Sequence, residues 1–239
     1  MKTFATIVAA LALARGAGAQ TAPTTIAQPA STLEEVHNPE LRIGLSSLSV
    51  LRSSVLDGAG EAHTTGSLTG VDLFARTQGI GVYARRLSGT FGTGSQGMAG
   101  GFTLEEARLV IGGPTLSVEA GAIRRTTSTL DDQRDQTFWR GGFRSNWDIG
   151  SSGVQVTLNA GGRFGKAAPS GTTTSLKFLG VDGEATLLVQ APRDLPIYGL
   201  VGWHYERFDD GWSMIARTEE ISGPFFGIGF RLASKPFLR

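Results

Sequence analysis

His204 and Glu206 are the residues whose types and spacing come nearest to catalytic chemistry. They lie two positions apart, so on a β-strand both side chains would point to the same face. A histidine beside a carboxylate can serve as a general base, and Asp209 and Asp210 follow shortly after. No nucleophile or second base stands in a recognisable spacing, and an ion pair explains the same residues. The sequence therefore predicts a non-enzymatic protein with no catalytic residue, and a hydrolase that uses His204 is an alternative.

Composition and spacing exclude several other kinds of site. The chain has no cysteine, which removes disulfides, thiolate metal sites and a cysteine nucleophile. Gly97–Gly101 is not followed by a helical segment, as a nucleotide-binding loop would require. Asp131, Asp132 and Asp135 could together hold a divalent cation, although a solvated loop explains them more simply. We therefore expect no metal and no cofactor.

Most of the remaining charged residues alternate with apolar residues at a period of two. Segment 137–149 is the clearest example, with aromatic residues on one face and arginines on the other. Segments 154–164 and 197–208 repeat this pattern, and residues 150–153 have the composition of a hairpin turn. Such alternation is typical of strands that separate an apolar from a polar environment.

About ten such segments follow residue 40, which suits a transmembrane barrel. They are residues 41–52, 66–76, 80–88, 102–112, 115–125, 137–149, 154–164, 175–190, 197–208 and 224–233. The joins after every second segment are tight, whereas the others have about ten residues or more, an alternation typical of short periplasmic turns and long extracellular loops. We therefore predict an all-β, antiparallel, up-and-down transmembrane barrel over residues 41–239, with eight strands as the alternative.

The first segment fits this pattern least well. Ile43 and Leu45 lie in one phase and Leu48 and Val50 in the other. A bulge or a different register would be needed to place all four on one face.

The first forty residues have a different character. Lys2, the apolar run 4–14 and Ala17-Gly18-Ala19 predict a signal peptide over residues 1–19. Residues 20–40 are rich in Pro, Thr and Ala and predict a flexible periplasmic leader. The formal net charge is only +1, and no basic segment is present, so nucleic acid is not expected as a partner.

If the apolar face of each segment meets lipid, the opposite face lines a lumen. Seven arginines, seven carboxylates and His204 fall on that face and are candidates for ion pairs: Asp72, Arg76, Arg85, Glu106, Arg108, Glu119, Arg140, Arg144, Asp148, Arg163, Asp182, Glu184, His204, Glu206 and Arg231. This balance of charge predicts cross-strand pairs that fill the space, whereas one dominant sign would indicate an ion-selective pore. Side chains fill a barrel of about eight strands, so ten strands lie near the closed limit.

Aromatic residues on the apolar face are candidates for the two girdles that flank a membrane. Trp139 and Trp147 are eight residues apart, which at a tilt near 40° is about 20 Å along the membrane normal. Trp203 and Tyr205 share the apolar face of another segment.

The end of the chain resembles the bacterial outer-membrane β-barrel superfamily. Gly227-Ile228-Gly229-Phe230-Arg231-Leu232 has the pattern of the terminal assembly signal of such proteins, and the chain continues to Phe237 near its end. The resemblance implies that the insertion machinery reads the last strand, with Phe230 and Leu232 or Phe237 in the terminal role. It also implies a place in the outer membrane, with lipid and lipopolysaccharide as partners.

Together these features predict a small non-enzymatic outer-membrane protein with a packed, salt-bridged interior. It would act in envelope integrity or in surface interaction through its extracellular loops, with an extracellular partner that the sequence does not identify. A narrow porin or small-solute channel is the alternative. Further alternatives are the hydrolase, since some barrels of the superfamily are proteases or lipid A hydrolases, and a secreted soluble barrel that binds an apolar ligand.

Overall fold

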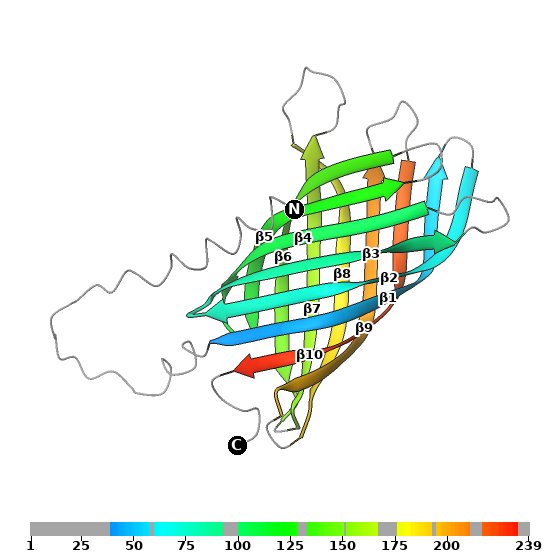
Figure 1. The fold of residues 1–239 in the computed structure, drawn as a ribbon. Helices are drawn as coiled ribbons and strands as arrows, with labels where there is room; N and C mark the ends of the chain where they lie inside the picture. Colours follow the sequence, from blue (N-terminus) through cyan, green and yellow to red (C-terminus); the bar gives the residue numbers. More distant parts are fainter. Residues whose placement is uncertain are drawn as a thin grey trace, which may run out of the picture. The chain divides into compact units, whose positions relative to one another are not determined.

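The computed structural model describes residues 39–57, 60–92, 100–128, 133–150, 152–166, 176–192, 195–210 and 217–233. Ten antiparallel strands close into one barrel, and β1 pairs with β10 to complete it (Figure 1). The strands are β1 (Glu40–Asp57), β2 (Gly60–Thr77), β3 (Ile80–Gly92), β4 (Gly100–Gly112), β5 (Leu116–Ser128), β6 (Gln133–Asp148), β7 (Val154–Lys166), β8 (Leu176–Gln190), β9 (Ile197–Asp210) and β10 (Arg217–Ala233). The predicted up-and-down barrel and its ten strands are confirmed.

Two predictions concern the start of the chain. The predicted signal peptide lies outside the described residues, as does nearly all of the predicted leader. Within the described part of the chain, no helix is long and apolar enough to cross a membrane.

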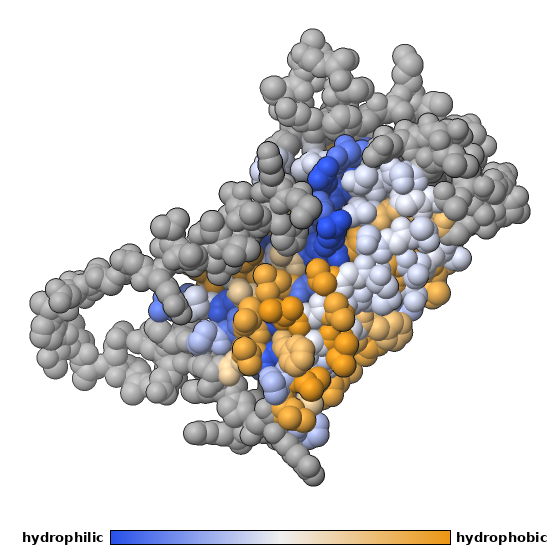
Figure 2. All heavy atoms as spheres, viewed as in Figure 1, coloured by the Kyte–Doolittle hydropathy of each residue, from blue (hydrophilic) through white to orange (hydrophobic). Residues whose placement is uncertain are grey.

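Successive residues of each strand face the outside and the inside of the barrel in turn, as the pleat requires. On β9, for example, Val201 and Trp203 are exposed on the wall, whereas His204 and Glu206 are buried in the interior. The wall is therefore largely apolar and much of the interior is charged, the reverse of what a soluble barrel needs. Figure 2 shows an extended orange region of hydrophobic residues on the viewed face.

The connections predicted to be long are shorter than the sequence indicated. At one end of the barrel, here called the upper end, the joins are residues 58–59, 93–99, 129–132, 167–175 and 211–216. The lower end carries residues 78–79, 113–115, 149–153 and 191–196. The join at residues 167–175 is close to its predicted length, and the others are shorter than predicted because segments rich in Ser and Thr continue to pair as strands. β-Branched threonine is well suited to strands.

The first strand also differs from its prediction. Leu48 and Val50 face inward, and the register of β1 shifts only beyond Leu48 against β10 and beyond Val50 against β2. No bulge therefore separates Leu45 from Leu48. The phase changes because the upper part of the interior is apolar.

Nine buried residues form this apolar layer: Leu48, Val50, Leu68, Leu87, Phe102, Leu104, Ile123, Ile221 and Phe225. The prediction of a lumen lined throughout by the polar face of each strand is wrong for this part of the barrel. The outward neighbours in this layer are mostly polar, such as Ser47 and Ser49 beside Leu48 and Thr103 and Glu105 beside Leu104. The alternation is therefore inverted here, with the apolar residues inside.

Candidate functional site

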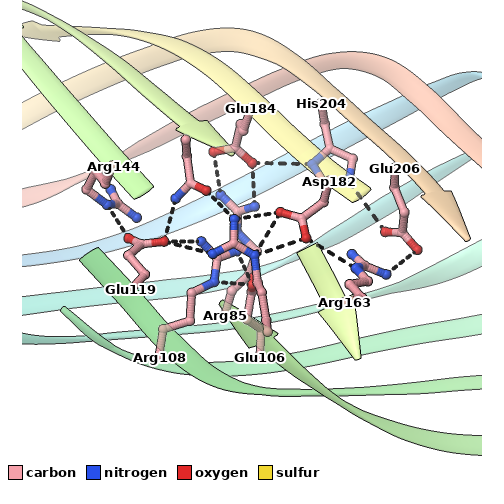
Figure 3. A network of polar contacts seen from close by, with 12 residues as sticks. Arg85, Glu106, Arg108, Glu119, Arg144, Arg163, Asp182, Glu184, His204 and Glu206 are labelled. Atoms are coloured by element: carbon pink, nitrogen blue, oxygen red, sulfur yellow. Dashed lines mark hydrogen bonds and ion pairs between the residues drawn. The ribbon is translucent and has the colours of Figure 1, made fainter. Parts of the chain in front are cut away.

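The middle of the interior holds a continuous network of charged side chains. Its members come from the inward positions of β3 to β9, and Figure 3 shows them directed toward one another across the lumen. They are Arg85, Glu106, Arg108, Glu119, Arg140, Arg144, Arg163, Asp182, Glu184, His204 and Glu206. All were predicted from strand parity to face the lumen, and the structure brings them together.

Glu119 on β5 is the hub of one half of the network. Its carboxylate oxygens lie 2.9 Å from Arg108 Nη1, 3.0 Å from Arg140 Nη1 and 2.6 Å from Arg144 Nε. Asn159 Nδ2 donates a further hydrogen bond of 2.8 Å. Glu119 has no exposed surface (0%), so this one carboxylate contacts three arginines away from water, and Glu106 and Asp182 supply further negative charge to Arg108 and Arg140.

Asp182 on β8 links this half to the other. It accepts hydrogen bonds from Arg140 Nε at 2.8 Å and from Arg163 Nε at 3.2 Å. Arg163 in turn lies 2.7 Å from Glu206 through its Nη1 atom. The chain of ion pairs thus runs from β5 through β6, β8 and β7 to β9.

His204 lies between two carboxylates at the far end of this chain. Its Nδ1 atom is 3.5 Å from Glu184 and its Nε2 atom 3.6 Å from Glu206. Glu184 also accepts a bidentate contact from Arg85 at 2.6 and 3.0 Å. A protonated His204 can donate to both carboxylates at once. Each ring nitrogen faces a carboxylate, so neither nitrogen points into open space.

The acidic partners considered for His204 do not join it. Asp209 faces outward and accepts a 2.8 Å hydrogen bond from Thr218, and the side chain of Asp210 lies outside the described residues. Asp135 pairs with Arg124 at 2.5 Å on the outer wall, and Asp131 and Asp132 lie outside the described residues. Within the described part of the chain, no group of three acidic or histidine side chains could hold a metal ion.

Four further candidates lie nearer the lower end. Arg231 Nε is 2.7 Å from Glu40, and Asp72 accepts a long contact of 3.5 Å from the Tyr198 hydroxyl. Arg76 donates to the carbonyl oxygen of Gly112. Asp148 lies on the inward face at the lower mouth of the barrel, where it is exposed because β6 ends there, and it accepts a 3.0 Å hydrogen bond from the buried Gln155.

The sequence analysis missed a second inward cluster above the network. Arg125 lies 2.5 Å from Glu219, and its guanidinium lies 5.0 Å from the ring centroid of Phe102 and 5.6 Å from that of Phe208. Arg125 shares the parity of Glu119 and could have been found from it. Glu219 precedes the segment predicted as the last strand, so its parity could not be used.

The interior leaves little free volume around these side chains. A void of about 10 Å³ is lined by Tyr83, Arg108, Arg144, Asn159, Asp182, Gly183, Glu184 and His204. This is about the volume that one water molecule needs. Around the charged network, the described side chains therefore leave room for about one water molecule.

The outward-facing candidates lie on the wall. Trp139, Trp147 and Trp203 are exposed, and Tyr205 is half-buried beside them. On β10, Phe230 and Leu232 are exposed on the wall, Gly227 faces the interior, and Phe237 lies outside the described residues. Closed antiparallel pairing, an apolar wall and a charged interior now stand together. This is the architecture of an outer-membrane β-barrel.

No protein-family model matches the chain, and no curated protein matches it. Similar solved structures include Neisserial surface protein A (10% identity, TM-score 0.32, covering 80% of this chain and 96% of that one). The outer membrane protein OprG from Pseudomonas aeruginosa has 12% identity and a TM-score of 0.30, over 83% and 97%. A mutant of the TodX monoaromatic hydrocarbon channel has 8% identity and a TM-score of 0.34, over 82% and 91%. Because these similarities are low, the fold is assigned from the strand pairing and the burial pattern of this chain.

Proposed function

We propose that this chain is a small non-enzymatic outer-membrane protein whose barrel is an anchor and whose working surface is its upper, extracellular end. The observation that supports this most is the filled interior. Seven strands contribute to one ion-pair network with Glu119 at its hub, and a buried apolar cluster from β10 and β1 to β5 lies above it. A barrel closed in this way offers no path for solutes and leaves its ends as the surfaces available to other molecules.

The wall supports the placement in a membrane. Trp139 and Phe143 on β6 are 61% and 62% exposed, and aromatic residues at such positions are stable only in an apolar or interfacial environment. Outward charges such as Arg207 and Glu220 begin above this apolar part of the wall. β1 begins and β10 ends at the lower end, which would face the periplasm.

Two other functions are less well supported by the site. A narrow channel would require rearrangement of the Glu119 hub, in which every contact is already made within the protein. A hydrolase would need an accessible His204, which instead is buried and faces two carboxylates. A role in envelope integrity and a role in surface interaction are both compatible with a closed barrel that anchors the protein in the membrane.

Complementation of a strain that lacks the protein tests the proposal. One variant replaces residues 93–99 and 167–175 by short Gly-Ser turns, and a second replaces Glu184 by Gln in the interior. We expect the turn variant to fold but to leave envelope sensitivity or surface binding uncorrected, whereas the interior variant restores it. Restoration by the turn variant and not by the interior variant would instead indicate a function inside the lumen.

A further inference from the structure

The wall of the barrel has two unlike halves. On β6, β7, β9 and β10 the outward residues include eight aromatic side chains: Trp139, Phe143, Trp147, Phe164, Trp203, Tyr205, Phe226 and Phe230. On β1 to β5, among the residues whose side chains are described, the aromatic ones (Phe74, Tyr83, Phe91 and Phe102) all face the interior. In the described residues, the half of the wall formed by β1 to β5 therefore lacks the aromatic residues that usually meet the membrane interface.

The apolar part of the wall is also shorter on this half. On β6 it extends from Trp139 to Trp147, eight residues, or about 20 Å along the membrane normal. On β3 it extends from Ile80 only to Ala84, about 10 Å, before Arg86 faces outward. Figure 2 shows a blue strip of hydrophilic residues crossing the viewed face beside the orange region, with pale residues beyond it.

On β6 the strip lies above the apolar wall, because Asp135 is four residues above Trp139, but at Arg86 on β3 it lies lower and would meet hydrocarbon. Charged side chains are unfavourable on the lipid face of a barrel, and thinning the bilayer to avoid them costs free energy for each ångström of mismatch. Covering this half of the wall by protein removes both costs.

The strip has an ordered pattern of charge. Arg86 on β3 lies 3.5 Å from Glu105 on β4, which lies 3.6 Å from Arg124 on β5, which lies 2.5 Å from Asp135 on β6. The four charges thus alternate in sign across four strands and sum to zero. A neutral strip gives no preference for an anionic lipid headgroup, which a cluster of arginines would favour.

Alternation over an even number of positions makes the strip complementary to itself. When two copies face each other about a two-fold axis between β4 and β5, Arg86 of one copy faces Asp135 of the other, and Glu105 faces Arg124. Every charge then meets its opposite. We propose that the β3–β6 wall is the interface of a homodimer, with this strip at its centre.

Because the chain contains no cysteine, single cysteines can test which wall is the interface. Ala122 faces outward on β5 just below the strip, and Ala185 faces outward on β8 on the other half of the wall. We expect a short bifunctional thiol reagent to join two copies through Ala122→Cys in membranes and not through Ala185→Cys. Heat-modifiable gel mobility confirms that both variants are folded.

A charge exchange tests the role of the strip itself. In the Ala122→Cys background, Arg124→Glu or Glu105→Arg alone places like charges opposite each other, and we expect the dimer yield to fall about tenfold or more. Co-expression of the two variants restores opposite charges and should restore the cross-linked dimer. Equal cross-linking at Ala122 and Ala185, a folded monomer at both positions, a conjugate with another protein, or no recovery on co-expression would overturn the proposal.

Discussion

Replacement of Glu119 by glutamine removes the charge at the hub of the interior while keeping the shape of the side chain. Three guanidiniums, those of Arg108, Arg140 and Arg144, lie within 3.0 Å of this carboxylate, which has no exposed surface. Loss of one partner from a buried ion pair leaves the remaining charge uncompensated and costs about 3–5 kcal/mol. We expect Glu119→Gln to lower the free energy of unfolding by about that amount.

Urea unfolding of the refolded barrel in lipid vesicles, followed by the fluorescence of its four tryptophans, measures this change. Asp209→Asn is the matched control, because Asp209 is exposed on the wall of β9 and accepts a 2.8 Å hydrogen bond from Thr218. Exposed polar contacts contribute about 0–1 kcal/mol. A Glu119→Gln variant that is destabilised no more than Asp209→Asn would refute the view that the network holds the barrel together.

Three other substitutions, two of them with a matched control, have expected outcomes in the same unfolding assay. A Cβ atom at Gly161 would lie 2.5–2.6 Å from the guanidinium of the neighbouring arginine on β6, so Gly161→Ala should cost about 1–3 kcal/mol, whereas Gly141→Ala, with nothing within 4 Å, should be neutral. Phe143→Arg should cost about 2–4 kcal/mol if that position meets hydrocarbon, and Thr90→Arg, high on β3, about 0–1 kcal/mol. Phe225→Ala should open a cavity in the apolar layer and cost about 3–5 kcal/mol; a change below 1 kcal/mol would indicate that this layer is loosely packed.

Strand parity carried most of the information that the sequence held about the site. Once the phase of β8 and β9 was known, Asp182, Glu184, His204 and Glu206 could only face the same side, and a closed barrel brings such faces together. Which arginine meets which carboxylate depends on shear and on the pairing of β1 with β10. Neither quantity is encoded in a local pattern, so the Glu119 hub could not be predicted.

The apolar layer could not be predicted for a related reason. Alternation detects a difference between two faces but not which face is inside, and at Leu48 and Leu104 the inward residues are apolar while their outward neighbours are polar. The extension of β1 to Asp57 could not be predicted either, because Ser and Thr are common in both loops and strands. The difference between the two halves of the wall appears only when the outward residues of all ten strands are compared at equal height.

The conductance of the purified, folded protein in a planar lipid bilayer tests most directly whether this barrel is a closed anchor. The packed network around Glu119 and the apolar layer above it predict a membrane that stays silent, with no steady single-channel steps across a range of voltage and salt. Reproducible steps from the folded wild-type chain, absent from heat-denatured samples, would contradict the closed interior and would make a narrow channel the better account.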